Sequence, residues 1–159
     1  MIHQTLVEML NDRGFVLNEN NLIATKEEQI IHIKILEQKK IGKREIINII
    51  QEMEEEEIGH LILVIPQKLT PLAVHELKMS NQEIEVFLYK ELMFNITKHY
   101  TQPKITLLTS EEKKSLIKEI KSSQLPIILK SDPIARYYNA KSGMVFKFQR
   151  PVIYYRIVV

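Results

Sequence analysis

The stretch KSDPIARYYNAKSGMVFKF, from Lys130 to Phe148, places a helix start, a short helix, a turn and a strand in close succession. Asp132, or Ser131 before it, can cap a helix, because a side-chain oxygen accepts the free N–H groups of the first turn. Pro133 suits the first helical position, where no N–H is needed. A helix of about six residues is unstable alone, so the strand that follows must hold it.

The side chains of this short helix divide into two sets. Ile134 and Tyr138 are four residues apart, share one face and are expected to attach the helix to a sheet. Arg136 and Tyr137 are left to point elsewhere. This separation favours docking on a partner over catalysis, and the stretch contains no nucleophile–base pair, metal cluster or phosphate loop.

The sequence on both sides of this stretch predicts a small sheet. LPIIL before it reads as a strand, and GMVFKFQ and VIYYRIVV read as two strands joined tightly through Arg150 and Pro151. Further upstream, ITLL is a short strand, and TSEEKKSLIKEIKSS is a helix that opens with a capping box of Thr109 and Glu112. The expected buried face of that helix is Leu116, Ile117 and Ile120.

The first hundred residues alternate helices and strands, as in an α/β unit. Helices are predicted over HQTLVEMLND, KREIINIIQEMEEEE and PLAVHELKM, and strands over NLIAT, EQIIHIKIL, HLILVIP and EIEVFLY. Gly14 is placed to end the first helix. Thr70 and Pro71 are the expected N-cap and first residue of the third helix.

The charge of the chain is divided unevenly. Residues 1–100 carry 11 basic and 16 acidic side chains, a net charge of −5, whereas residues 101–159 carry 11 basic and 4 acidic, a net charge of +7. This shift, with Pro103 beside it, predicts two domains, 1–98 and 99–159, the second suited to an acidic partner. The expected fold class is α+β.

Composition excludes several classes of protein. The 159 residues include no cysteine, which removes disulfide frameworks and Cys-based zinc sites. No apolar run reaches the roughly 20 residues of a membrane span, and MIHQTLVEML lacks the pattern of a secretory signal. Ligand spacing such as H-x-x-x-H is absent from the histidines, which are His3, His32, His60, His75 and His99. We therefore expect no catalytic residues, no metal and no cofactor.

Two alternatives remain open at this stage. A metal-dependent nuclease would need a carboxylate two residues before a strand lysine, but Lys34 has His32 there, and no lysine follows Glu83 and Glu85 in their strand. An autonomous nucleic-acid-binding protein would use the basic second half. Its aromatic residues, however, are paired or alternating as in a small core, which does not predict a stacking surface.

The quoted stretch resembles the C-terminal assembly domain of the subunit shared by eukaryotic nuclear RNA polymerases I, II and III, and the archaeal RNA polymerase subunit that corresponds to this domain alone. The resemblance is carried by LP, SDPIARYY, SGMVFKF, RP and YRIVV in that order. VEMLNDRGF, LILVIPQKLTPLAVHEL and EVFLYKELMFNITKH resemble the N-terminal jaw domain of the eukaryotic subunit, so the likeness covers nearly the whole chain.

This resemblance implies a non-catalytic structural subunit of DNA-directed RNA polymerase, present as one copy in a hetero-oligomer in the nucleus. It implies an N-terminal α/β jaw domain with a nuclease-like but inactive sheet that lines the downstream double-stranded DNA. It also implies a small α+β assembly domain, with a mostly antiparallel sheet and two helices, that docks on the largest subunit. The partner-binding residues carried over are Asp132, Pro133, Arg136, Tyr137, Arg150, Tyr155 and Arg156, and the DNA-proximal ones are Lys68, Thr70 and Pro71.

The sequence departs from the family pattern at two places. Val152 and Ile153 alone stand where family members carry a longer SETAG-like loop, and the N-terminal domain lacks a segment after RGF. Such shortening suggests a compacted genome, so a viral factory or virion is the alternative location.

Overall fold

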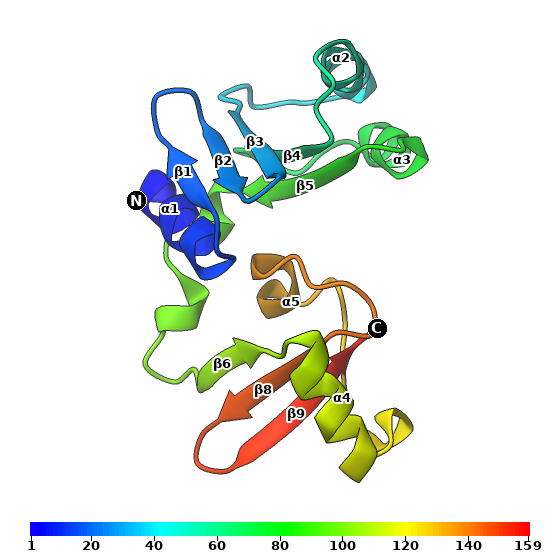
Figure 1. Cartoon of the computed structure of the whole chain (residues 1–159). Coiled ribbons are helices and arrows are strands. Elements are labelled where there is room, and N and C mark those ends of the chain that lie inside the picture. The colour runs from blue at the N-terminus through cyan, green and yellow to red at the C-terminus, as the bar shows by residue number, and fades with distance from the viewer. The chain divides into compact units, whose positions relative to one another are not determined.

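The computed structural model describes all 159 residues, which form two compact units, Met1–Phe94 and Asn95–Val159. Figure 1 shows a sheet with flanking helices in each unit. The division falls directly after Phe94, whereas the charge shift and Pro103 placed it near residues 98–104. None of the helices has the length and apolarity needed to span a bilayer.

The first unit is built on a mixed five-stranded sheet of order β1-β2-β3-β4-β5. Its strands are β1 (Val16–Asn18), β2 (Ile23–Lys26), β3 (Gln29–Ile35), β4 (His60–Ile65) and β5 (Glu83–Leu88). The first three strands are antiparallel, and β3, β4 and β5 are parallel. β4 lies between two parallel neighbours with Leu61 through Ile65 all buried, so its continuous apolar run correctly predicted an interior strand.

Three helices accompany this sheet, α1 (Ile2–Asp12), α2 (Lys43–Glu55) and α3 (Pro71–Met79). Ile46, Ile49 and Met53 are the buried residues of α2, and they share a core with Leu63 of β4 and Ala73 of α3. The Thr70 hydroxyl accepts a hydrogen bond from the Ala73 amide at 3.3 Å, which confirms the predicted cap. A short 3-10 turn, η1 (Tyr89–Glu91), follows β5.

The strand β1 was missed by the sequence analysis, which placed no element between the first helix and NLIAT. Gly14 ends α1 with φ of +85°, a left-handed conformation that glycine adopts without a Cβ penalty. The chain then pairs Leu17 with Ala24 in a three-residue strand. So short a strand, with its first and last side chains exposed, leaves almost no periodic signal in the sequence.

The second unit contains a four-stranded sheet of order β6-β8-β9-β7. These strands are β6 (Lys104–Leu107), β7 (Ile127–Ile128), β8 (Val145–Gln149) and β9 (Ile153–Val158). The pairs of β8 with β6 and β9 are antiparallel, and only β7 runs parallel to β9. The mostly antiparallel sheet expected for this part of the chain is therefore confirmed.

Two α-helices and two 3-10 turns complete this unit. They are α4 (Ser110–Glu119), α5 (Pro133–Tyr137), η2 (Ile96–Lys98) and η3 (Ser122–Gln124). The capping box of α4 is confirmed, since Thr109 and Glu112 bond each other's backbone amides. Ile120 is a correction to the expected buried face: it is the C-cap, in extended conformation and 37% exposed. The helix ends one residue too early for its side chain to reach the core.

Candidate partner-docking surface

The start of the short helix α5 is stabilised as its sequence predicted. The Asp132 carboxylate accepts a hydrogen bond from the Ile134 amide at 2.9 Å, and Pro133 occupies the first helical position. Ile134 is buried in a core with Phe146 and Phe148 of β8. Asp132 and Pro133 remain at least partly exposed, so this helix start is accessible.

Tyr137 corrects the expectation that it points away from the unit's interior. Only 3% of Tyr137 is exposed, and its hydroxyl accepts a hydrogen bond from the Asn95 side-chain amide at 3.0 Å. Asn95 also caps η2 by accepting a bond from the Thr97 amide at 2.9 Å. A buried phenol needs a hydrogen-bond partner, and the bond between Tyr137 and Asn95 joins α5 to η2. Arg136, beside Tyr137, is half-buried.

Aromatic rings form a continuous series from α5 to the surface of the second sheet. Tyr138 contacts Phe146 at 5.6 Å between ring centroids, Phe146 contacts Phe148 at 6.2 Å, and Phe148 stacks on Tyr154 at 4.9 Å. The Phe148 and Tyr154 rings are nearly parallel, at an interplanar angle of 5°. Phe146 and Phe148 are core residues, as their alternation predicted, but 38% of Tyr154 is exposed.

Arg156 completes a surface group with these rings. Its guanidinium carbon lies 6.0 Å from the Phe148 centroid and 5.9 Å from the Tyr154 centroid, within the range of a cation–π contact. Alternation along β9 places Tyr154 and Arg156 on the same face. We call Phe148, Tyr154 and Arg156 the aromatic platform. Arg156 was predicted from the sequence as a partner-binding residue and Tyr154 was not, although the alternation along β9 places both on one face.

The remaining partner-binding candidates lie outside this platform. Arg150, in the exposed β8–β9 turn, donates a hydrogen bond from Nη1 to the Tyr100 carbonyl at 2.6 Å. Tyr155 points to the opposite face of β9, where it lines an open hollow of about 480 Å³ with Leu108 and Leu116. Tyr155 and Arg156, which are adjacent in β9, therefore lie on opposite faces of the sheet.

The DNA-proximal candidates lie in the first unit, where β4 leads into α3. Lys68 and Pro71 are exposed, whereas Thr70 is half-buried and its hydroxyl serves as the cap. Leu72 follows with 65% of its surface exposed. The start of α3 is therefore an accessible segment that carries one positive charge in the loop before it.

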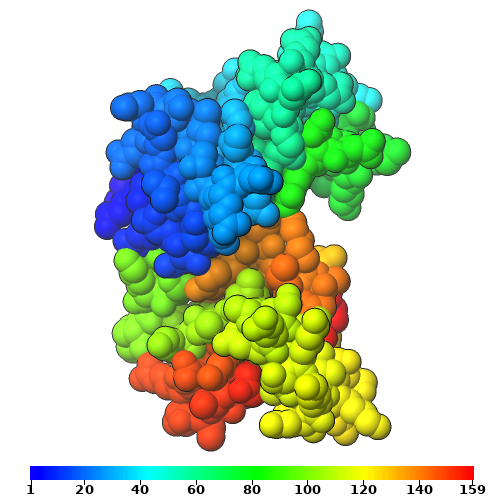
Figure 2. Space-filling view, viewed as in Figure 1, coloured from blue at the N-terminus to red at the C-terminus, as the bar shows by residue number.

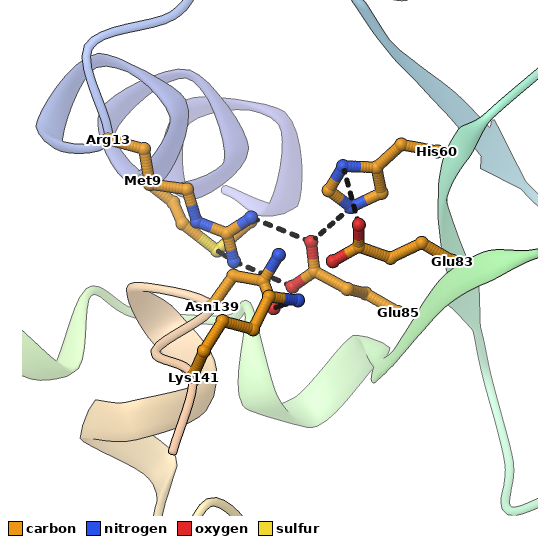
Figure 3. Close-up of polar contacts among 7 residues, drawn as sticks. All are labelled: Met9, Arg13, His60, Glu83, Glu85, Asn139 and Lys141. Carbon is orange, nitrogen blue, oxygen red and sulfur yellow. Dashed lines mark hydrogen bonds and ion pairs between the residues drawn. The ribbon is translucent and has the colours of Figure 1, made fainter. Parts of the chain in front are cut away.

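A buried cluster of charges in the first unit was missed by the sequence analysis. Arg13, at the end of α1, donates from both terminal nitrogens to the two Glu85 carboxylate oxygens at 2.8 Å (Figure 3). His60 Nε2 lies 2.7 Å from the same carboxylate, while the neighbouring Glu83 is 4.0 Å from Nδ1. The side chains of Arg13, Glu85 and His60 are 4%, 12% and 16% exposed.

This cluster bears directly on the nuclease alternative. Both oxygens of Glu85 are already engaged by Arg13, and Lys34 is paired with Glu52. No group of three or more His, Asp and Glu side chains is arranged to hold a metal ion. The Glu85 carboxylate of β5 therefore links this strand to α1 through Arg13.

Comparison with known proteins identifies the family. A family model described as RNA polymerase Rpb5, C-terminal domain, matches residues 94–158, which is the second unit almost completely. A relative from Caenorhabditis briggsae is 39% identical, with 99% of this chain and 94% of the relative covered. The chain belongs to the Rpb5 family.

Two other Rpb5 relatives extend over both units. One from Dictyostelium discoideum is 34% identical, covering 94% of this chain and 88% of its own length. This protein and the one from C. briggsae are named as subunits of DNA-directed RNA polymerases I, II and III. An Arabidopsis thaliana relative, DNA-directed RNA polymerase subunit 5-like protein 1, is 31% identical over 94% of this chain and 87% of its own length. The first unit thus belongs to the Rpb5 family as well as the second.

Proposed function

We propose that this Rpb5-family chain is a non-catalytic subunit of a DNA-directed RNA polymerase. The observation that carries the proposal is the match of both units to proteins named as polymerase subunits. The eukaryotic sources of these relatives favour the nucleus as the location, with a viral factory or virion as the alternative for a shortened chain.

The second unit docks on the largest polymerase subunit in this proposal, and the aromatic platform is its main contact. A guanidinium held over two stacked rings is pre-organised, so it loses little conformational entropy when it meets a carboxylate. The net charge of +7 over residues 101–159 favours an acidic partner surface. Asp132, Pro133 and Arg150 contribute accessible polar contacts, while Tyr137 holds α5 in place from within the unit.

The first unit lines the path of downstream double-stranded DNA, and Lys68 with the start of α3 is the segment that approaches it. Residues 1–94 carry 10 basic and 16 acidic side chains, and this net charge of −6 opposes strong DNA binding by the first unit alone. Contact with DNA therefore depends on placement by the rest of the polymerase.

Affinity purification of the tagged full-length chain from its own cells tests the proposal. The two large polymerase subunits should be recovered with the wild-type chain, and Arg156→Glu should lower their recovery at least about tenfold, since it places like charge against an acidic surface. Lys114→Glu on the exposed side of α4 is the matched control, with the same change in charge away from the platform.

Three results would contradict the proposal. Recovery of the wild-type chain without either large subunit would remove the polymerase assignment. Tight, salt-sensitive binding of duplex DNA by the isolated chain would favour an autonomous nucleic-acid-binding protein, and Mg²⁺-dependent cleavage of DNA would restore the nuclease alternative.

A further inference from the structure

We propose that the outer edge of β7 accepts an extended segment of the partner polypeptide as a fifth strand of the second sheet. The identity of that partner as a large polymerase subunit rests on the proposed function. Strand addition of this kind gains affinity from main-chain hydrogen bonds and specificity from alternate side chains. β7 is one of the two edge strands of the order β6-β8-β9-β7.

The hydrogen bonds of β7 show which backbone groups face outward. The Pro126 and Ile128 carbonyls accept bonds from the Ile157 and Val159 amides at 2.8 and 3.0 Å, and the Lys130 amide donates to the Val159 carbonyl at 2.9 Å. Successive residues of a strand direct their backbone groups to opposite sides. Ile127 and Leu129 therefore present theirs outward.

Three outward groups are left for a partner strand. The Leu129 carbonyl already accepts a bond from the Asp132 amide at 3.0 Å. The Ile127 amide, the Ile127 carbonyl and the Leu129 amide have no partner in the chain. Their spacing, with donor, acceptor and donor along one edge, is that of a strand that lacks a neighbour.

The side chains along this edge are apolar and exposed. Ile127 is 57% exposed, Leu129 is 56% exposed and Val159, next to Leu129 at the end of β9, is 46% exposed. The register pairs Ile127 with Ile157, so Ile127, Leu129 and Val159 share the face that α4 covers. In the view of Figure 2, the segment of α4 and η3, coloured yellow-green to yellow, lies on the surface of this unit. A soluble chain normally shields such an edge with charge or a covering loop.

These features specify the chemistry of the occupant. An incoming strand must carry apolar side chains at alternate positions to cover Ile127 and Leu129. Exposed Lys130 beside them, in a region of net charge +7, favours acidic residues next to those apolar positions. A second copy of this chain fits less well, because pairing two such edges would bring like charges together.

Hydrogen exchange of the full-length chain, alone and within the purified polymerase, tests the added strand. In the isolated chain the Ile127 and Leu129 amides should exchange as open groups, while the Lys130 amide is protected by its bond to Val159. In the complex the exchange of the Ile127 and Leu129 amides should slow at least about 100-fold. Unchanged exchange within an intact complex would overturn the strand addition and leave the proposed function standing.

A pair of substitutions at one position gives a second readout. Leu129→Pro removes the outward N–H and keeps the ladder bonds to β9, whereas Leu129→Ala shortens the side chain and keeps the N–H. Recovery of the large subunits should be at least about tenfold lower with proline than with alanine. Equal recovery with two variants of equal melting temperature would overturn the proposal. Protection that appears on concentrating the isolated chain would assign the edge to self-association instead.

Discussion

At the scale of single residues, the Glu85 carboxylate shows how a charge is retained inside the first unit. Burial raises the pKa of Glu85, but hydrogen bonds from His60 and Arg13 and their charges outweigh it, so the pKa is held below its ordinary value. The carboxylate therefore joins α1 to β5 in its ionised form. Its neighbour Glu83 has a side chain that is 43% exposed.

Replacing Glu85 by glutamine should lower the free energy of unfolding by about 3 kcal/mol, because Arg13 would be left buried without its counter-charge. Glu83→Gln is the matched control two residues away on the same strand and should cost less than about 1 kcal/mol. Urea unfolding at pH 7 measures both values. Equal losses of unfolding free energy for the two variants would show that the buried Arg13–Glu85 pair stabilises the fold no more than the exposed Glu83 does.

The Glu85 carboxylate also makes the free energy of unfolding depend on pH, in a direction that follows from its lowered pKa. A group with a lowered folded-state pKa stabilises the fold fully above its unfolded pKa, and this stabilisation is lost as pH falls through the folded pKa. The contribution of Glu85 should be complete at neutral pH and decline below its ordinary value of 4.5. Urea unfolding of the wild type and Glu85→Gln should therefore converge as pH falls below that value, and a constant difference would contradict this assignment.

At the scale of elements, α5 depends on its cap and on the sheet beneath it. The helix has five residues, and three of them, Ile134, Ala135 and Tyr137, are buried. Because so short a helix cannot form alone, its stability comes from this packing and from the Asp132 cap.

Asp132→Ala should lower the free energy of unfolding of the second unit by about 1 kcal/mol, the usual cost of losing an N-cap. For a unit of this size that corresponds to a fall in melting temperature of roughly 4–8 °C. Ser131→Ala, one residue earlier and also exposed, makes no cap bond and serves as the control. Equal melting temperatures of the two variants by calorimetry would show that the Asp132 cap does not contribute to stability.

Strand β9 provides a second test at this scale through two adjacent valines. Val158 is 1% exposed and packs in the core with Ile128 and Phe146, whereas Val159 is 46% exposed. Val158→Ala should cost about 2 kcal/mol, from lost burial and the cavity left behind. Val159→Ala should cost less than about 0.5 kcal/mol. Denaturant unfolding that ranks the two in reverse order would contradict the observed register of β9.

At the scale of the whole molecule, the two units carry opposite net charges. The excess of basic residues in the second suits an acidic protein surface, and the excess of acidic residues in the first weakens any autonomous hold on DNA. In the proposed function, the first unit reaches DNA only when the rest of the polymerase positions it. The effect of a DNA-facing substitution should therefore be measured on the assembled polymerase.

Lys68→Glu should weaken downstream DNA binding by the assembled polymerase and reduce the slope of log affinity against log salt concentration by about 1. Lys39→Glu, an equally exposed lysine in the loop before α2, is the control with the same change in charge. Fluorescence anisotropy with labelled duplex over a series of salt concentrations gives both slopes. An unchanged slope for Lys68→Glu would place the start of α3 away from DNA.

Elements with local signals were predictable from the sequence: the caps at Thr70, Thr109 and Asp132, the buried strand β4 and the β8–β9 hairpin. Caps and periodic apolar runs are recognisable because their interactions lie within a few residues. The family resemblance likewise rests on contiguous blocks of sequence, which the family model and full-length relatives confirmed.

Features that depend on residues far apart in the chain could not be predicted and became visible in the folded structure. Arg13 and Glu85 are 72 residues apart, and Asn95 and Tyr137 are 42 apart, so neither buried contact leaves a periodic signal. The open edge of β7 likewise depends on the order in which strands assemble. Burial and strand pairing depend on which distant residues the folded sheet brings together. Strand propensity and helix capping depend on residues that are neighbours in the chain.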